Sequence, residues 1–430
     1  MKKTFAMTLQ AALQRNKCLS GSDKKENQTK YHSGSFSYVL LGDKTAEISS
    51  YKGRSSNLNI PDKLKGHTVT SIGEKAFCEC KSLTSVTIPD GVLSIGKKAF
   101  YECKNLTSVT IPDSVTSIEY GTFAWCTSLA SVTIPDSVTS IGEWAFTECF
   151  SLASVTIPCS ITRIEGDTFS GCTSLASVMI PDIVTSIGVR AFAYCKSFTS
   201  VTIPNSVMSI GKYAFQGCEN LASVTIPNSV THIGESAFED CKSLTSVTIP
   251  NSVTSIGDFA FSGCTSLASV AIHDSVTSIG EWAFYGCKSL TRVVIPDSVT
   301  NIGEWAFAGC KSLNSVTIPN SVTHIGESVF QECESLTSVV LPVSVTSIGN
   351  NAFLGCKSLT SVTIPYRVTR IGSKVFYGCE SLTSVMIPDS VTSIEKSVFN
   401  DSDKLTLTVK RDSYAKRYAA DNNIPYIYWN

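Results

Sequence analysis

The sequence predicts a repeat solenoid, a fold in which short coils of chain stack on one another along a single axis. Three observations predict it: proline, phenylalanine and cysteine each recur with a step of 23 residues. Phenylalanine keeps this step fifteen times from Phe77 to Phe399, and cysteine keeps it fourteen times from Cys80 to Cys379. A fixed period in the twenties indicates that each copy is one structural unit, which buries its apolar residues against neighbouring copies.

Each copy is expected to start with a short strand that is buried on one face. In the copy that holds Pro112, Val109 and Ile111 alternate with Ser and Thr, which is the two-residue period of a strand. Pro112 has no backbone N–H, so it ends the strand. Val115 and Ile118 then predict a second short extended segment on another side of the coil.

The second half of each copy holds a glycine, the phenylalanine and the cysteine. The glycine is consistent with a sharp bend, but a positive φ is not required, because Glu119, Glu165 and Glu395 replace it. Phenylalanine and cysteine lie three residues apart, as Phe146 and Cys149 do, so they would share one face of a short helical turn. Eight apolar positions in each copy are therefore expected to point inward.

The spacing Leu-x-x-Val-x-Ile in a period of this length is the signature of a leucine-rich repeat. We therefore expect a right-handed leucine-rich-repeat coil with a parallel β-sheet, short second strands and short helical turns, capped at both ends. Parallel strands lie about 4.8 Å apart, so equivalent residues of successive copies should form rows along the solenoid.

The repeat resembles a known family. Its motif is Ser-Leu-Thr-Ser-Val-Thr-Ile-Pro-Asn-Ser-Val-Thr-Ser-Ile-Gly-x-x-Ala-Phe-x-x-Cys, as in residues 243–264. This motif is similar to that of the BspA-like leucine-rich-repeat family of surface proteins from host-associated bacteria and some protozoa, and the match covers residues 36–430. The resemblance implies a cell-surface or secreted protein that adheres to host matrix proteins or epithelial cells.

We divide the chain into four segments. They are a leader or a disordered or helical segment at 1–34, an N-terminal cap hairpin with an irregular first coil at 35–66, the 23-residue repeats at 67–402, and a C-terminal cap helix and strand at 403–430. In the first segment Lys2 and Lys3 precede a short apolar stretch, but Arg15 and Lys17 follow where an export signal has small residues. A cytoplasmic location is therefore the alternative to the cell surface.

The two end segments depart from the repeat. Residues 36–51 predict a hairpin, and Ser402 stands where the next cysteine would be. Residues 405–409 shift the strand register by one, residues 413–423 predict a helix, and residues 424–429 predict a last extended segment. Such ends would cover the core and the sheet edge that a terminal coil exposes.

Composition argues against several partner classes. Charged residues make up 17% of the chain and the formal net charge is −1, so there is no basic footprint for nucleic acid. No apolar run approaches the roughly 18–20 residues that span a membrane. We expect a monomer without a transmembrane segment.

Cysteines are numerous but mostly belong to the repeat. Fourteen of the seventeen lie on it, which leaves Cys18, Cys78 and Cys159. Side chains stacked in parallel disfavour disulfide geometry, so the repeated cysteines are expected to be buried free thiols that pack as small hydrophobic groups. Zinc is not expected, because paired short spacings are missing.

The sequence gives no sign of catalysis. His232 and His324 occupy the same repeat position but are four copies apart, about 19 Å by strand spacing, which is too far to share a metal. No nucleophile elbow, phosphate loop or paired-carboxylate pattern appears. We therefore expect no enzyme activity, no metal, no cofactor and no catalytic residue.

One candidate binding surface is the outward face of the main strands. Thr usually stands between Val and Ile there and Ser stands before Val, which keeps the face soluble and favours strands. Met179 and Met386 interrupt that pattern singly, whereas Ala271, Arg292, Val294 and Val340 interrupt it close together. We name these four residues the sheet-face break and predict that they contact a partner; the alternative is that the face only needs to be soluble.

A second candidate surface lies two residues before the repeated phenylalanine, where the residue varies from copy to copy. Phe259, Trp282 and Trp305 hold this position in three consecutive copies, with Tyr285 nearby. We name these four residues the aromatic ladder. They predict either mutual stacking that stabilises the coils or an exposed patch that recognises protein or glycan.

These observations predict a protein that binds another macromolecule through its repeat surface. A surface or secreted adhesin for a host or matrix protein is favoured by the resemblance. An intracellular interaction scaffold is the alternative, because the export signal is weak. A purely structural or antigenic repeat protein is the third possibility.

Overall fold

The computed structural model describes residues 28–42 and 44–429, so most of the predicted leader at 1–34 lies outside the described residues. Two compact units can be distinguished, Met1–Ser160 and Ile161–Asn430, and each is described by itself. Both consist of stacked coils whose strands pair in parallel. The leucine-rich-repeat solenoid predicted from the sequence is confirmed.

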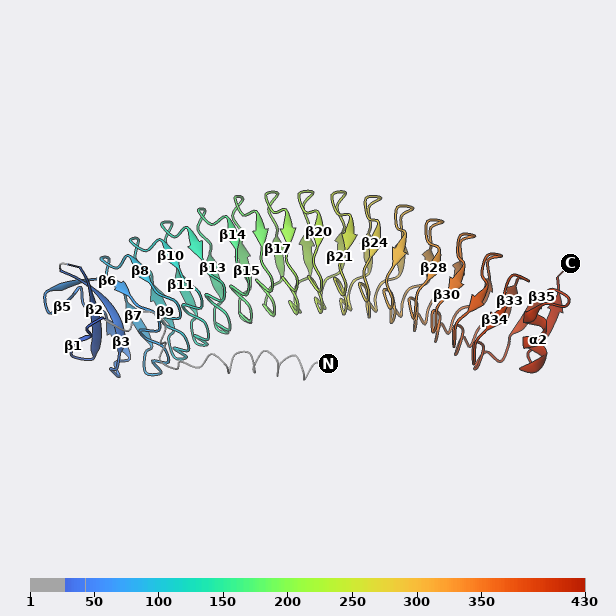
Figure 1. Cartoon of the computed structure of the whole chain (residues 1–430), viewed down its shortest axis with the longest axis horizontal. Helices are drawn as coiled ribbons and strands as arrows, with labels where there is room; N and C mark the ends of the chain where they lie inside the picture. The colour runs from blue at the N-terminus through green and yellow to red at the C-terminus, as the bar shows by residue number, and fades with distance from the viewer. Residues whose placement is uncertain (1–27, 43, 430) are drawn as a thin grey trace. The chain divides into compact units, whose positions relative to one another are not determined.

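The first unit opens with antiparallel strands. β1 (Tyr31–Ser33), β2 (Phe36–Gly42) and β3 (Thr45–Tyr51) pair in order, and β2 with β3 forms the hairpin that the sequence predicts. β3 also pairs in parallel with β6 (His67–Ile72), which holds β5 (Lys63–Leu64) on its other side. The hairpin is therefore continuous with the sheet of the coils (Figure 1).

Each coil carries two short strands, which we call the main strand and the second strand. In the first unit the main strands are β4 (Asn57–Asn59), β7 (Ser85–Thr87), β9 (Ser108–Thr110), β11 (Ser131–Thr133) and β13 (Ser154–Thr156). The second strands of its regular coils are β8 (Ser94–Ile95), β10 (Ser117–Ile118) and β12 (Ser140–Ile141).

The second unit repeats the same coil. Its main strands are β15 (Ser177–Met179), β17 (Ser200–Thr202), β19 (Ser223–Thr225), β21 (Ser246–Thr248), β23 (Ser269–Ala271), β25 (Arg292–Val294), β27 (Ser315–Thr317), β29 (Ser338–Val340), β31 (Ser361–Thr363), β33 (Ser384–Ile387) and β35 (Thr406–Val409). Its second strands are β14 (Arg163–Ile164), β16 (Ser186–Ile187), β18 (Ser209–Ile210), β20 (His232–Ile233), β22 (Ser255–Ile256), β24 (Ser278–Ile279), β26 (Asn301–Ile302), β28 (His324–Ile325), β30 (Ser347–Ile348), β32 (Arg370–Ile371) and β34 (Ser393–Ile394).

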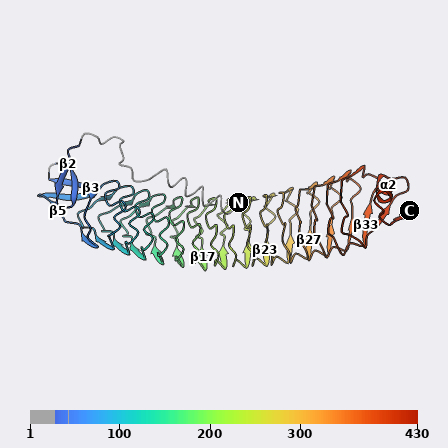
Figure 2. The same cartoon turned by 90° about the horizontal axis from the view of Figure 1, so that it is seen from below.

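Strand pairing places equivalent residues of successive copies side by side. Val293 of β25, for example, pairs with Val316 of β27, one period further along the chain. In Figure 2 the main strands β17, β23, β27 and β33 of the second unit follow one another along one side. The predicted rows are therefore present, and the properties of the surface can be read along them.

The core is a stack of identical side chains. In the coil that ends at Cys310, Val299, Ile302 and Phe307 are buried, and so are their equivalents in neighbouring coils. Consecutive phenylalanine rings are nearly parallel, as Phe284 and Phe307 show with 5.3 Å between ring centroids and 5° between ring planes. Burial of these rings on both faces adds apolar contact between coils to that of the Val, Ile and Leu rows.

The segment around the phenylalanine differs from the predicted helical turn. Trp305 lies two residues before Phe307 and Gly309 lies two residues after it. Their φ values of 60° and 71° are in the left-handed region. The backbone N–H groups of Trp305, Phe307 and Gly309 donate to carbonyl groups of the next coil at 2.7–3.0 Å. Every second backbone N–H of this segment thus donates to the next coil, whereas the N–H groups of a helix donate to carbonyl groups of the same helix.

The repeated glycine lets successive coils approach closely. Gly303 is not among the residues with positive φ, which confirms that the left-handed region is not required there. A Cβ atom added to Gly303 would lie 2.4 Å from the backbone nitrogen of Glu281 in the preceding coil. Close approach of the preceding coil, rather than a sharp bend, therefore accounts for glycine at Gly303, although Glu119, Glu165 and Glu395 show that other coils accept a side chain there.

Small polar groups also connect the coils. The Ser298 hydroxyl donates to the Val276 carbonyl at 2.6 Å, and the Cys310 thiol donates to the Phe284 carbonyl at 3.3 Å. Equivalent serine and cysteine contacts recur along both units. The Ser hydroxyl satisfies a carbonyl group of the preceding coil, and the Cys thiol adds a second donor to a phenylalanine carbonyl that already accepts from a backbone N–H, as Phe284 does from Cys287.

The C-terminal end of the second unit departs from the repeat as the sequence predicts. Pairing of Ile387 with Val409 gives a spacing one residue shorter than the repeat. The helix α2 (Tyr414–Asp421) follows, capped by the Ser413 side chain, which accepts from the backbone N–H of Lys416. β36 (Tyr426–Tyr428) then pairs in parallel with β35. No helix in the described part of the chain is long and apolar enough to cross a membrane.

Candidate binding surfaces

The aromatic ladder forms a continuous stack of rings in the second unit. Phe259 and Trp282 are separated by 5.8 Å between ring centroids, and Trp282 and Trp305 by 4.6 Å, with ring planes 8° and 2° apart. Tyr285 contacts Trp282 edge-on at 4.8 Å. The predicted stacking is confirmed, and it joins three consecutive coils.

The backbone at this position is fixed independently of the side chain. Phe259, Trp282 and Trp305 have φ values of 56°, 57° and 60°, and Lys98 and Ser236 have equivalent values in their coils. The N–H of Trp282 donates to the Glu304 carbonyl of the next coil at 3.0 Å. The main chain therefore holds these residues in place whichever side chain is present, which explains why the position varies.

The ladder is only partly open to solvent. Phe259, Trp282 and Trp305 are half-buried, because each ring covers its neighbour's face, whereas Tyr285 is exposed. Solvent therefore contacts only part of each stacked ring, because neighbouring rings cover most of the ring faces. The ladder stabilises the coils and also offers an aromatic surface.

The sheet-face break is far more exposed. Val294 is 51% exposed and Val340 is 75% exposed, and Ala271 and Arg292 also face solvent. Val294 and Val340 each pair with Thr317, which lies between them. The four residues therefore lie on the same outward face of neighbouring main strands, as the sequence predicts, although Thr317 interrupts the apolar row.

The two candidate surfaces belong to different segments of the coil. The break lies on the main strands β23, β25 and β29, whereas the ladder lies in the turns around the phenylalanine row. The structure brings the members of each surface together. No ring contact, hydrogen bond or ion pair in the described part of the chain joins one surface to the other.

Sequence reasoning missed an exposed row in the turns that follow the main strands. Val343 and Tyr366 are 55% and 61% exposed and occupy the same position in consecutive coils. In the other copies from Asp90 to Asp389 this position holds Asp or Asn, apart from Cys159. The change from Asp or Asn to Val343 and Tyr366 is visible in the sequence and could have indicated this exposed row.

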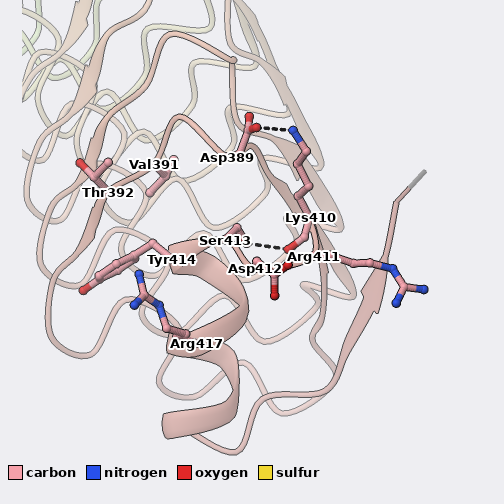
Figure 3. A pocket seen from close by; sticks show the side chains of 9 residues that line it. All are labelled: Asp389, Val391, Thr392, Lys410, Arg411, Asp412, Ser413, Tyr414 and Arg417. Carbon is pink, nitrogen blue, oxygen red and sulfur yellow. Dashed lines mark hydrogen bonds and ion pairs between the residues drawn. The ribbon is translucent and has the colours of Figure 1, made fainter.

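A cleft of about 410 Å³ lies at the end of this row, between the last regular coil and α2 (Figure 3). Its charged lining residues are Lys410, Arg411, Arg417, Asp389 and Asp412, and Tyr414 also lines it. Lys410 reaches across to Asp389 and forms an ion pair, which lowers the pKa of that carboxyl group. The Arg417 guanidinium lies over the Tyr414 ring and the Arg411 guanidinium over the Tyr428 ring.

The repeated cysteines are buried free thiols from Cys103 to Cys379, as predicted, and Cys80 is half-buried. Burial raises the pKa of the Cys310 and Cys379 thiols to about 12. Cys159 is free and exposed, and Cys78 is disulfide-bonded. Among residues 28–42 and 44–429 no group of three or more His, Cys, Asp or Glu side chains could hold a metal ion.

Fold and surfaces together define a leucine-rich-repeat protein, a class whose members bind other proteins and are typically not enzymes. The chain belongs to the family described as the BspA type leucine-rich repeat region, whose six-copy model matches residues 47–176, 162–291 and 277–406. These matches overlap and together span most of the repeats.

Two solved structures illustrate the similarity. A leucine-rich repeat protein from Bacteroides ovatus ATCC 8483 is 29% identical with a TM-score of 0.75, and the alignment covers 93% of this chain and 100% of that one. A leucine-rich cell surface protein from Faecalibacterium prausnitzii A2-165 is 32% identical with a TM-score of 0.52, covering 93% and 98%. No curated protein matches the chain.

Proposed function

We propose that the protein is a surface or secreted adhesin that binds a host or matrix protein through the outward face of its main strands. The observation that carries this proposal is the exposure of Val294 and Val340 where most other coils have Thr. Folding does not need an apolar side chain there, because Thr serves the same strand position in neighbouring coils. Exposed apolar side chains rimmed by polar residues mark protein interaction sites.

The aromatic ladder is proposed as an additional contact for protein or glycan. Its partly exposed rings combine apolar area with low conformational entropy, which is why aromatic residues are enriched at interfaces. Rigid stacking also means that little freedom would be lost on binding. Tyr285 is the most accessible member of the ladder and adds a hydroxyl group.

Surface location is supported by a relative. The Faecalibacterium prausnitzii protein, which is 32% identical over most of both chains, is named a cell surface protein. Intact cells that carry the native gene would be labelled with an antibody against the repeats, with and without external protease. Protease-sensitive labelling is expected for an adhesin. Labelling only after permeabilisation would contradict it and would favour the intracellular scaffold.

The binding face can be tested by restoring the common residue. Val294→Thr with Val340→Thr should leave the fold intact, because Thr occupies the equivalent site in Thr317 and Thr363. Binding of the purified protein to immobilised matrix proteins and to epithelial cells is expected to fall at least about tenfold, as for loss of an interface anchor.

Met179 provides a matched control for that experiment. It lies in the same row of the sheet face and is 79% exposed, but it is several coils away from Val294 and Val340. Met179→Thr should therefore leave binding unchanged. Equal binding by all variants would exclude the proposed face, and failure of the native protein to bind any matrix protein or cell would favour the structural or antigenic alternative.

A further inference from the structure

Four successive turns at the C-terminal end of the second unit are closed by the same backbone hydrogen bond, although the last one also has a left-handed residue, Asp412, at φ 63°. The N–H groups of Val345, Val368 and Val391 donate to the prolines three residues earlier, and the N–H of Ser413 donates to Lys410 in the same way. The first central residues of these turns are Val343, Tyr366, Asp389 and Arg411, which we name the turn-tip row. Central residues of such turns carry side chains at the surface.

The register of the strands places these tips next to one another. Ile387 pairs with Val409, and Asp389 and Arg411 each follow two residues later. Ser338 pairs with Ser361 and Ser361 with Ser384, which aligns the three preceding coils. Adjacent tips are therefore separated by about 5 Å, the spacing of paired strands.

The apolar half of the row has no evident role in folding. Tyr366 is 61% exposed and makes no ring contact, hydrogen bond or ion pair with any described residue. Arg367 follows it in the same turn, where the other copies have Ser apart from Gly91 and Ile183, and is also exposed. Tyr and Arg together replace the Asp-Ser pair of an ordinary turn, as in Asp297 and Ser298. These two types dominate the energetic centres of protein interfaces.

The other half of the row carries excess positive charge. Asp389 is already paired with Lys410, whereas Arg367, Arg411 and Arg417 make no ion pair with a described residue. Arg411 and Arg417 line the cleft of about 410 Å³ that begins at Asp389. Each rests on a tyrosine ring, which leaves the edges of the guanidinium group available to bind a carboxylate.

The geometry points to a docking site for an acidic segment of a partner protein, formed by the turn-tip row and the adjoining cleft. A large apolar side chain of that segment packs against Val343 and Tyr366, and neighbouring carboxylates bind Arg367, Arg411 and Arg417. Charge favours this occupant, because among the described residues three arginines without an ion pair face a single carboxylate without one, Asp412, which also lines the cleft. The site shares no residue with the sheet-face break, although Val340 and Val343 lie in the same coil, and it does not depend on where in the cell the protein is located.

A selection from displayed random peptides tests this proposal. The full chain is used as bait and compared with Tyr366→Asp combined with Arg367→Ser, which restores the ordinary Asp-Ser turn and so retains the fold. Selection on the native protein should enrich peptides with a large apolar residue beside Asp or Glu. Their affinity for the restored turn should fall at least about tenfold.

Arg411→Glu tests the charge separately. It should lower the affinity for the acidic peptides at least about tenfold and reduce the salt dependence of their binding. Met179→Thr should leave both unchanged. The proposal is overturned if the selected peptides bind the restored turn equally well, if basic peptides are enriched, or if nothing is enriched beyond the restored-turn bait.

A second copy of the chain is the other possible occupant. Self-association of the native protein that disappears in the Tyr366→Asp and Arg367→Ser variant, measured by light scattering, would overturn the proposal in favour of a dimer interface. Because all these variants keep Val294 and Val340, adhesion through the main-strand face should persist in them. Failure of one proposal can therefore be distinguished from failure of the other.

Discussion

The indole rings of Trp282 and Trp305 are stacked 4.6 Å apart and within 2° of parallel, although the two residues are a full repeat apart in sequence. Both stand at a left-handed backbone position. A non-glycine residue in that conformation costs about 1–2 kcal/mol. Backbone hydrogen bonds to the next coil hold this conformation in other copies too, and ring stacking adds side-chain contact between the coils of Trp282 and Trp305.

Replacing Trp282 should therefore destabilise the coils more than replacing its neighbour. Trp282 contacts Phe259, Trp305 and Tyr285, whereas Trp305 contacts only the ring of Trp282 among the described aromatic residues. We expect Trp282→Ala to lower the free energy of unfolding by about 2–3 kcal/mol and Trp305→Ala by about half as much. Urea unfolding followed by circular dichroism measures both. A larger loss for Trp305→Ala would contradict the ladder as described.

The repeated glycine can be tested at two positions that differ in available space. An added Cβ at Gly303 would lie 2.4 Å from the backbone of Glu281, whereas at Gly326 its nearest neighbour is a Val329 methyl group at 3.4 Å. We expect Gly303→Ala to cost about 1–3 kcal/mol, because backbone atoms must move. Gly326→Ala should change stability by no more than about 0.5 kcal/mol. Equal thermal shifts for the two variants would argue against close coil approach as the reason for glycine.

The left-handed position also predicts a stabilising substitution. Ser328 has a φ of 55° and is buried, and its hydroxyl finds no hydrogen-bond partner. Ser328→Gly removes both the backbone strain and the unsatisfied group, so the free energy of unfolding should rise by roughly 1 kcal/mol. Asn351 holds the same position in the next coil with a φ of 57°.

Asparagine tolerates this conformation far better than serine does, so Asn351→Gly serves as the control and should give little or no gain. Both variants would be compared with the native protein by thermal unfolding. A similar rise in the free energy of unfolding in both variants would mean that the unsatisfied Ser328 hydroxyl does not lower the stability of the native protein.

Buried thiols should make the protein sensitive to alkali. Burial raises the pKa of Cys310 from 9.0 to about 12. The folded state therefore keeps a proton that the unfolded state releases, and the resulting stability is complete below about pH 9 and is lost as pH rises toward 12. Each such thiol contributes a slope of about 1.4 kcal/mol per pH unit in that window.

Cys310→Ser should make this slope shallower by the contribution of one thiol, measured by urea unfolding at a series of pH values from neutral to alkaline. Serine is accepted in this row, because the Ser402 hydroxyl donates to the Phe376 carbonyl as the thiols do. Cys159→Ser alters an exposed cysteine without touching the core and is the control. An unchanged slope for Cys310→Ser would show that its thiol does not titrate on unfolding.

Much of this fold could be predicted from the sequence because periodicity alone defines the rows. The strand at Val293, the strand end at Pro296 and the burial of Phe307 and Cys310 all follow from alternation, proline chemistry and repetition. The C-terminal helix was also predicted, and the structure shortens it to Tyr414–Asp421.

The turn around the phenylalanine could not be predicted in the same way. Spacing of three residues between Phe307 and Cys310 suits a helical turn, and only the structure shows that alternate N–H groups bond to the next coil and that the residues two before and two after the phenylalanine have left-handed φ. Side chains as different as Trp305 and Ser328 stand at that position, so composition gives no sign of it. The sequence shows that the residue two before the phenylalanine varies, but it does not show that the backbone conformation there is the reason.

The rows that carry the candidate residues could be recognised in the sequence, whereas the turn-tip row was missed. Trp282 and Val340 were recognisable because they break a polar or variable row, and the structure places each with its expected neighbours. Tyr366 breaks the Asp or Asn row just as plainly. Its significance depends on the approach of Arg411, which comes from a strand whose register is shifted by one residue and from a turn without proline.

The backbone hydrogen bond at the variable position has an evolutionary consequence. Lys98, Asp167 and Phe259 adopt nearly the same φ, between 54° and 56°, so a change of residue there leaves the main chain in place. Neighbouring copies are also nearly identical, which favours unequal recombination between them. Gene duplication within the array can thus add, remove or reorder coils that present different side chains while preserving every contact between backbones. New binding specificities can arise by shuffling copies, without a period of instability.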